Sequence, residues 1–457
     1  MVGLGYAHAM RPPFLSLVPL LLGTLIACGP SQPSGPLPGA GVVAIVGGQL
    51  IDGTGSDPIA ESVVLVRDGR IETVGPRSST PVPDGAEVVA ATGQTVMPGL
   101  VETHAHYHGD LDRVRRQFRT QLYFGVTTAR SIGADPPDKV ALMLEAHAGQ
   151  VTAPRMYTAG LGFSYPDGFP PGSPVNRPHT DDEARQMVAA LAEQGVHFVK
   201  MWVNRMPTPG MKITPEMRTT VVEQAIVHDL VPVAHIIEEA DLAQLLDLGV
   251  RDFLHTVEDT DISQDLLERL RETGTVLSPT LTNMHAGWLW IDHPELLDDP
   301  EVRAAFEPEA LARWSDPAHR DEAAADPTLE GRKARLAGAM AFVNILTDAG
   351  VRVAVGTDSG AGNGTWNVPQ GWGTHHELEL YVEAGLTPMQ AIVAATQTGA
   401  TLLSRGEPEF GILAAGKVAD LIVLNGDPLA DIANTRDIER VMQRGEWLDR
   451  TTLMTIP

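Results

Sequence analysis

Eight short apolar segments alternate with helical segments through the middle of the chain, and this alternation is the feature that most constrains the fold. The candidate strands are GLVETH, GVTTARS, RMYTAG, HFVKMWV, VPVAH, DFLH, VLSPTL and VRVAVGTD. Two of the helices begin with capping-box patterns, Thr180–Glu183 and Thr387–Gln390. Eight strands that alternate with helices predict an α/β protein built on a TIM-type (β/α)8 barrel. The alternative is an open doubly wound sheet, but no G-x-G-x-x-G motif follows the first strand.

The two ends of the folded region have a different pattern, in which short apolar strands are broken by Gly and Asp turns. This pattern covers residues 42–97 and returns in residues 406–457, for example in KVADLIVLNGD. We therefore expect one small β-sandwich domain built from both termini, with the barrel in residues 98–405 between its two parts. The stretch 282–331 is long for a barrel connection, and we expect it to be a partly helical insertion after the seventh strand.

Residues 1–27 are typical of a bacterial lipoprotein signal peptide. The apolar run Phe14–Ala27 is too short for a membrane-spanning helix, which needs about 20 residues, but it suits a signal peptide. The run ends in LIAC (25–28), which resembles a lipobox, and Cys28 is the only cysteine of the chain. The following Pro- and Gly-rich residues 28–41 predict a flexible tether. The sequence thus predicts lipidation at Cys28 and a location in the bacterial cell envelope, on the periplasmic or outer-membrane side, with the membrane contacted only through the lipid.

Composition narrows the classes of function and of metal site. The chain carries 33 basic and 58 acidic residues, a formal charge of −25, and no basic block offsets it. Nucleic-acid binding is therefore not expected. A single cysteine allows neither an internal disulfide nor a thiolate metal cage, so metal ligands would have to be nitrogen or oxygen donors.

Metal-competent side chains stand at the ends of five candidate strands. His104 and His106 close the first strand, and a spacing of two places both imidazoles on one side of it. Four further strands end in a polar residue after an apolar run: Lys200, His235, His255 and Asp358. The carboxyl ends of barrel strands converge on one mouth, so these residues are expected to form one site.

These segments resemble the amidohydrolase superfamily, and the resemblance covers most of the chain. It rests on VMPGLVETHAH, the strand lysine, the two later histidines and VGTDSG. The stretches HHELELYVEAGLTPMQAIVAAT and FGILAAGKVADLIVLNGDPL resemble the imidazolonepropionase-like group, which includes Xaa-Pro dipeptidases. The resemblance implies a metallo-barrel with a flanking β-sandwich and two divalent metal ions. It implies that one ion is held by His104, His106 and Asp358, that the other is held by His235 and His255, and that a CO2-derived carbamate on Lys200 bridges the two.

Each residue type in this ligand set is chemically suited to the role that the resemblance implies. A carbamate offers two anionic oxygens, whereas a lysine ammonium would be repelled by two cations, and arginine stays protonated. Imidazole and carboxylate ligands suit Zn²⁺. A water that bridges two cations loses a proton near neutral pH, and Asp358 is expected to be the catalytic acid and base that passes a proton to the leaving amine. The expected function is cleavage of an amide C–N bond in a small peptide, an Xaa-Pro-like dipeptide or an N-acyl amino acid.

Two alternatives stay open at the level of sequence. The first is a mononuclear cyclic-amide hydrolase or deaminase of the imidazolonepropionase kind, whose single ion would be held by His104, His106, His235 and Asp358, leaving Lys200 without a metal role. The second is a catalytically silent binding protein of the cell envelope. The sequence also leaves open whether the chain forms a homo-oligomer.

Residues at or just beyond other strand ends are candidates for contacts with the substrate, and these are Tyr157, Tyr165, Trp202, Asn204 and Arg205. Arg205 is suited to a substrate carboxylate. The Gly-rich loop Gly360–Gly373 is a candidate lid because glycines permit movement. His375 and His376 follow this loop and are expected on a helix surface, and His108 is expected to have no role in the site.

Overall fold

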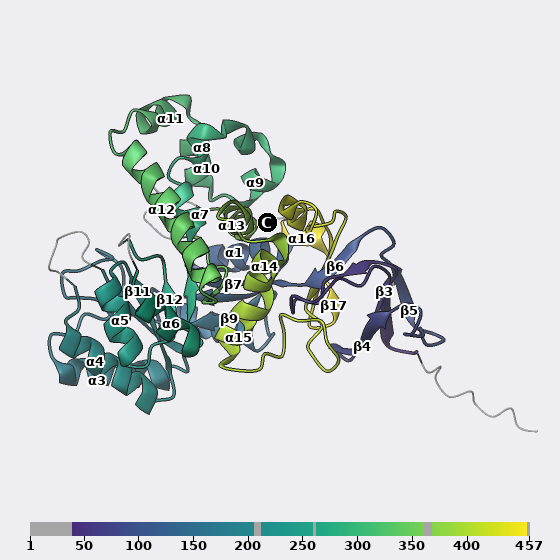
Figure 1. Ribbon diagram of the computed structural model, residues 1–457, viewed down its shortest axis with the longest axis horizontal. Helices are drawn as coiled ribbons and strands as arrows, with labels where there is room; N and C mark the ends of the chain where they lie inside the picture. The colour runs from purple at the N-terminus through teal and green to yellow at the C-terminus, as the bar shows by residue number, and fades with distance from the viewer. Residues whose placement is uncertain (1–38, 205–211, 259–261, 361–367, 455–457) are drawn as a thin grey trace, which may run out of the picture. The chain divides into compact units, whose positions relative to one another are not determined.

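The computed structural model describes residues 39–204, 212–258, 262–360 and 368–454 (Figure 1). Cys28 and Arg205 lie outside these ranges, as does the segment 361–367 of the Gly-rich loop. Two parallel sheets alternate with helices, which confirms the α/β class. The three-stranded sheet consists of β7 (Leu100–Ala105), β8 (Val126–Ser131) and β9 (Arg155–Thr158). The five-stranded sheet consists of β10 (Phe198–Val203), β11 (Val231–Ile236), β12 (Asp252–Leu254), β13 (Val276–Ser278) and β14 (Arg352–Val353).

Backbone hydrogen bonds connect these two parallel sheets at two places. The segment after β9 joins β10, because the N–H of Phe163 donates to the carbonyl of Lys200 at 2.6 Å and the N–H of Trp202 donates to the carbonyl of Phe163 at 2.9 Å. The segment after β14 joins β7, because the N–H of His106 donates to the carbonyl of Ser359 at 2.7 Å. Each sheet is thus bonded to the other at both of its edges.

Helices separate the parallel strands along the chain. They are α1 (Leu111–Tyr123), α2 (Pro137–His147), α3 (Asp181–Glu193), α4 (Pro215–Val227), α5 (Glu239–Asp247), α6 (Gln264–Glu272) and α12 (Leu329–Asp348). Further helices follow β14: α13 (Trp372–Glu383), α14 (Pro388–Val393), η2 (Ala394–Thr398), α15 (Gly399–Ser404), η3 (Ile432–Arg436) and α16 (Arg450–Leu453). The expected capping box at α14 is complete. At α3 the Thr180 hydroxyl caps Glu183, but the Glu183 carboxylate accepts from the N–H of His179 instead of that of Thr180. None of the described helices is both long and apolar enough to span a membrane.

The long stretch after β13 is helical. It contains α7 (Leu281–His285), α8 (Leu289–Asp292), η1 (Pro294–Asp298), α9 (Pro300–Ala305), α10 (Pro308–Ser315) and α11 (Pro317–Ala324). Helices α8 to α11 lie together in Figure 1, around a separate apolar cluster that includes Trp290, Phe306 and Trp314. Phe124 and Trp372, from outside the insertion, belong to the same cluster, so the insertion packs on the barrel-side segments through it.

Residues from both ends of the folded region share one mixed sheet. Its strands, in order, are β17 (Glu446–Trp447), β16 (Ile438–Gln443), β15 (Leu421–Leu424), β6 (Thr95–Pro98) and β2 (Gln49–Leu50). A second sheet has the order β4 (Arg70–Pro76), β3 (Ser62–Arg67), β1 (Val42–Val46) and β5 (Glu87–Ala90). Side chains of both sheets, among them Val64, Val96 and Leu421, are buried in one apolar cluster. The two β-rich segments read from the sequence thus meet in three dimensions.

Candidate metal centre

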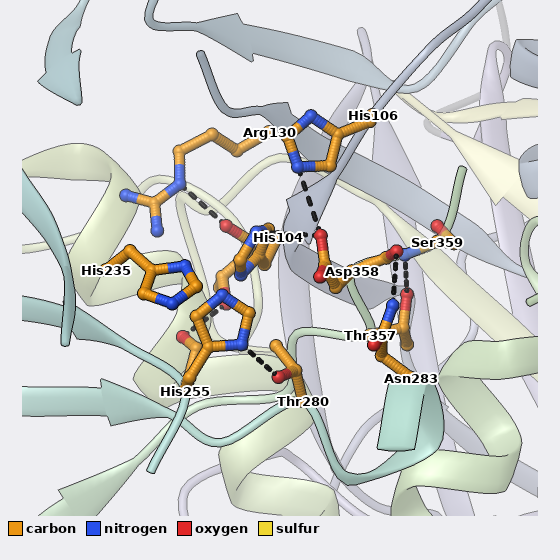
Figure 2. Close-up of polar contacts among 12 residues, drawn as sticks. His104, His106, Arg130, His235, His255, Thr280, Asn283, Thr357, Asp358 and Ser359 are labelled. Atoms are coloured by element: carbon orange, nitrogen blue, oxygen red, sulfur yellow. Dashed lines mark hydrogen bonds and ion pairs between the residues drawn. The ribbon is translucent and has the colours of Figure 1, made fainter. Parts of the chain in front are cut away.

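Strands of both parallel sheets, and the segments that follow them, bring the four expected histidine ligands and Asp358 to one place (Figure 2). His104 lies in β7 and His235 in β11, whereas His255 directly follows β12. The candidate ligand atoms of His104, His255 and Asp358 all lie within 4.8 Å of one another. The imidazole centroid of His255 is 3.9 Å from that of His235 and 5.0 Å from that of His104. The structure thus brings His104, His235, His255 and Asp358 together.

Asp358 contacts both histidines of the first strand. Its Oδ1 lies 3.1 Å from Nε2 of His104 and 3.0 Å from Nε2 of His106. Burial opposes ionisation of Asp358, but the two imidazoles outweigh it and hold the pKa of this carboxyl well below its usual range. Three ligand atoms of one candidate ion site therefore converge, and the acid among them is ionised.

Hydrogen bonds to one ring nitrogen orient the other two histidines. Nδ1 of His255 is 2.7 Å from the Thr280 hydroxyl, which leaves Nε2 for a ligand. Nε2 of His235 is 3.3 Å from the Asn204 amide nitrogen, and the amide oxygen of Asn204 is buried without a partner. With the amide turned over, this oxygen accepts from Nε2–H and Nδ1 is the nitrogen left for a ligand. Fixing one nitrogen of an imidazole is how proteins aim the other at a metal. Burial also lowers the pKa of His255 to about 4 and that of His235 well below its usual value, so both rings are neutral and able to bind a cation.

Three residues at this site have a backbone conformation that residues other than glycine seldom adopt. His255, Thr280 and Asp358 have positive φ angles of 70°, 59° and 55°. A non-glycine residue in the left-handed region costs energy, and such residues concentrate at functional sites. The N–H of Asp358 donates to the carbonyl of His104 at 2.7 Å, which helps to hold this geometry.

Lys200 is fully buried in the middle of β10, and its Nζ has no hydrogen-bond partner among the described residues. Burial lowers the pKa of its amine to about 7. Two glycines leave room for this side chain: a Cβ at Gly133 would lie 2.8 Å from Lys200 Cγ, and one at Gly162 would lie 3.0 Å from Lys200 Cβ. A buried amine without a partner is costly, and a group bound at this site would satisfy it.

Two buried acids brace the backbone around the ligands, and the sequence analysis did not identify them. Glu102 accepts from the N–H of His104 at 2.9 Å and from that of Thr357 at 3.0 Å, and burial raises its pKa to about 8. Glu377 of α13 accepts from the first two N–H groups of α7, and burial raises its pKa to about 7. The one available signal was an acid inside an apolar run, as in GLVETH.

A buried ion pair also lies beside the site. The guanidinium of Arg130 in β8 pairs with the carboxylate of Asp252 in β12, and its Nε donates to the carbonyl of Thr103 at 2.7 Å. Both side chains are almost fully buried. This pair connects the two parallel sheets next to the first ligand strand, and Figure 2 shows the guanidinium of Arg130 there.

The residues expected to contact a substrate do not all lie at this centre. The ring of Trp202 is beside Lys200, with its centroid 5.2 Å from the amine. The ring of Tyr157 instead packs between His147 and His197, at centroid distances of 4.8 and 4.9 Å. Tyr165 is half-buried on the loop after β9. Arg205 lies outside the described residues.

The expectation that His375 and His376 lie on a helix surface is wrong. Both are buried, because α13 packs against both α7 and η3. Nε2 of His375 is 2.9 Å from the carbonyl of Phe124, and its Nδ1 is 2.9 Å from the Thr435 hydroxyl. His108 is exposed, and its ring lies parallel to that of His106 at 6.4 Å.

Comparisons with known proteins agree with this geometry. The model of the amidohydrolase family matches residues 95–448. An ochratoxinase of Aspergillus niger is 24% identical over 449 residues, covering 86% of this chain and 83% of the fungal one. An imidazolonepropionase of Deinococcus radiodurans is 25% identical over 399 residues, covering 82% and 88%. The crystal structure of a putative prolidase from Bifidobacterium longum superposes with a TM-score of 0.72 and 26% identity, covering 91% of this chain and 99% of that one.

The chain belongs to the amidohydrolase family, since the match spans far more than half of its length. The expected class, an enzyme that hydrolyses carbon–nitrogen bonds, is thereby confirmed.

Proposed function

We propose that this protein is a binuclear metal-dependent hydrolase that cleaves the amide bond of an Xaa-Pro-like dipeptide or an N-acyl amino acid. One observation carries the binuclear form: Lys200 lies on β10 next to the strand that carries His235, and its amine is fully buried without a hydrogen-bond partner in the described chain. In the mononuclear alternative this amine would stay unsatisfied at a cost of about 1–3 kcal/mol. In the binuclear form the Lys200 nitrogen is part of a carbamate whose oxygens would bind the two metal ions.

The residues present fit two cations. His104, His106 and Asp358 would hold one ion, His235 and His255 the other, and carboxylated Lys200 would bridge them. The neutral imidazoles and ionised carboxylate suit zinc. The parallel strands, joined at both edges of each sheet, support a closed (β/α)8 barrel that presents this set at its mouth, and the shared apolar cluster of the two terminal sheets supports a β-sandwich beside it.

Two divalent ions would supply an acidified water and polarise the scissile carbonyl. Asp358 stands where it can take the proton of the attacking water, because its Oδ1 lies between two histidine nitrogens. It then returns the proton to the leaving amine, so that a carboxylic acid and a free amine are released. Glu102 keeps the backbone of His104 and Thr357 in place throughout.

The substrate class is supported by the printed functions of similar proteins. The structures that resemble this chain include a putative prolidase and a Xaa-Pro dipeptidase, and the sequence relatives include an ochratoxinase. The test is a zinc-loaded sample assayed against Xaa-Pro dipeptides and N-acyl amino acids, with a metal-stripped sample as the control. We expect hydrolysis only in the loaded sample. Hydrolysis of imidazolonepropionate or deamination of a purine, with no dipeptide or N-acyl amino acid cleaved, would favour the mononuclear alternative. Binding of these compounds without turnover would favour a silent binding protein.

The proposed location is the bacterial cell envelope, with the enzyme held by a lipid on Cys28 and its site reached by small amides outside the cytoplasm. The proposal is supported by the lipobox-like LIAC and by the Pro- and Gly-rich stretch that follows it.

A further inference from the structure

The loop after β9 carries an aromatic ring to the candidate metal centre. Phe169 is half-buried, and its ring centroid lies 6.3 Å from that of His235, with an angle of 54° between the rings. At this distance the edges of the two rings are close to contact. A half-exposed phenylalanine beside a ligand histidine leaves part of its surface for another apolar group.

The base of this loop is fixed to the strand that carries Lys200. Phe163 pairs with β10 on both sides of Met201, through the bonds to Lys200 and Trp202 described above. The far side of the loop is closed by Asn176, whose N–H donates to the carbonyl of Gly162 at 2.8 Å and whose side-chain amide donates to that of Leu161 at 2.6 Å. The loop therefore moves with the metal-bearing strand.

One arginine braces the tip of the loop from inside. The Arg177 guanidinium donates to four backbone carbonyls, at 2.6 to 3.2 Å, and these belong to Tyr165, Pro166, Gly168 and Pro170. The hydroxyl of Ser164 donates to the carbonyl of Phe169 itself at 2.5 Å. The planar fork of five arginine donors suits such a cradle, and a lysine could not reproduce it. Phe169 is thus held in place before any substrate arrives.

We propose that Phe169 determines substrate specificity by packing against an aromatic or large aliphatic group next to the scissile amide, and that Arg177 is its positioning residue. This rests on the proposed amide hydrolysis and names the substrate class of the same site. Because the ring is already fixed, packing against it costs little conformational entropy. A charged group would have to lose water to pack there, so its binding is disfavoured. Such a contact should raise the affinity for an aromatic ligand roughly three- to tenfold over that for a matched small one.

The test compares matched compounds on zinc-loaded full-length protein. The substrate pairs are Phe-Pro with Ala-Pro, and N-acetylphenylalanine with N-acetylalanine. The binding pair is phenylacetohydroxamate with acetohydroxamate, which ligate metal without being turned over. We expect the aromatic member to be preferred by roughly three- to tenfold in kcat/KM for at least one substrate pair, and in Kd for the hydroxamates.

Four variants identify the source of the preference. Phe169→Ala should abolish the preference by weakening the turnover and binding of the aromatic member, whereas Phe169→Leu should keep part of the preference. Arg177→Lys should weaken it mainly through KM, because the ring is no longer fixed while the metal ligands are untouched. Val175→Ala removes apolar atoms from the same loop and should change nothing.

The outcomes separate this inference from the proposed function. An unchanged aromatic preference in Phe169→Ala would overturn the inference even if amides are hydrolysed. A hydroxamate preference that depends on Phe169, in a protein that cleaves no amide, would uphold the inference and reject the proposed function. Equal binding of both hydroxamates and equal turnover within both pairs would also overturn it.

Discussion

Asp358 contacts both histidines of the first ligand strand and has an unusual backbone conformation. Its carboxylate approaches Nε2 of both His104 and His106, and its φ angle is 55°. The sequence suggested an apolar strand that runs to Asp358 in VRVAVGTD, but β14 ends at Val353 and Asp358 lies on the segment after it, where it still reaches the two histidines. The pairing of His104 with His106 was readable, since residues two apart share a side of a strand.

Asp358→Asn should leave the protein folded and lower kcat by about 10²–10⁴-fold, because a positioned acid–base group contributes that much. The amide keeps the size of the side chain but cannot take a proton. The measurement is kcat on the best substrate, with zinc content determined on the same sample to separate proton transfer from metal loss. A fully loaded variant with near-normal kcat would remove Asp358 from the proton transfer.

The role of Glu102 and the position of the Tyr157 ring could not be predicted from the local sequence. Glu102 bonds to Thr357 and Thr374, which are more than 250 residues away, and such partners cannot be read from a local pattern. Tyr157 was expected at the mouth, yet its ring packs against His147 and His197. Neighbouring side chains of a strand point to opposite faces, so an error of one residue in register reverses the expected side.

At the scale of elements, β8 and β12 are connected by the buried Arg130–Asp252 pair. Asp252→Ala should destabilise the fold by about 3–5 kcal/mol, since it leaves the Arg130 charge buried without a partner. The free energy of unfolding in urea measures this. The double variant Arg130→Met/Asp252→Leu removes both charges and should cost less than the single variant. A double variant that is less stable than Asp252→Ala would show that the ion pair is not the source of the loss.

The packing of α13 explains why His375 and His376 were wrongly expected on a helix surface. Its polar side chains are buried because they bond to neighbouring segments, Glu377 to α7 and His375 to Phe124 and Thr435. An amphipathic pattern cannot reveal a helix that is covered on several sides by polar contacts. The helices and parallel strands themselves were predictable because their apolar runs and caps are local.

His375 of α13 should make the free energy of unfolding depend on pH. Burial lowers the pKa of His375 to about 4, below its usual 6.5, so the neutral ring stabilises the fold above pH 6.5. This stabilisation is lost as the pH falls from 6.5 toward 4, and it amounts to about 3 kcal/mol. His375→Gln keeps polar atoms but does not titrate. Urea unfolding of both proteins across this range should show the stability advantage of the wild type shrinking as the pH falls, and a constant difference would contradict the assignment.

At the scale of the whole molecule, the sequence predicted that both ends contribute to shared β-structure, and β6 does pair with β15. The length of the insertion was visible, but the apolar cluster around Trp290 was not, because that cluster depends on contacts with Trp372 beyond β14. Which apolar group the site accepts depends on the loop after β9, where no strand or helix pattern guides a reading.

The proposed anchor makes a prediction about the intact protein in a bacterial cell. Cys28→Ser should move the protein from the membrane fraction to the soluble fraction, because the lipid supplies the attachment. Its kcat/KM on amides should stay unchanged, since Cys28 is far in sequence from the candidate metal ligands, the first of which is His104. Fractionation of cells that express either form tests this, and an unchanged membrane fraction for the variant would reject lipidation at Cys28.

The binuclear centre is tested most directly by the metal content of wild-type protein and of Lys200→Ala, reconstituted with zinc and bicarbonate. Lys333→Ala is the matched control, because Lys333 only pairs with Asp292 at the surface. We predict two ions per chain in the wild type and the control, and fewer ions with almost no amide hydrolysis in Lys200→Ala. Full metal content together with wild-type turnover in Lys200→Ala would contradict the binuclear centre.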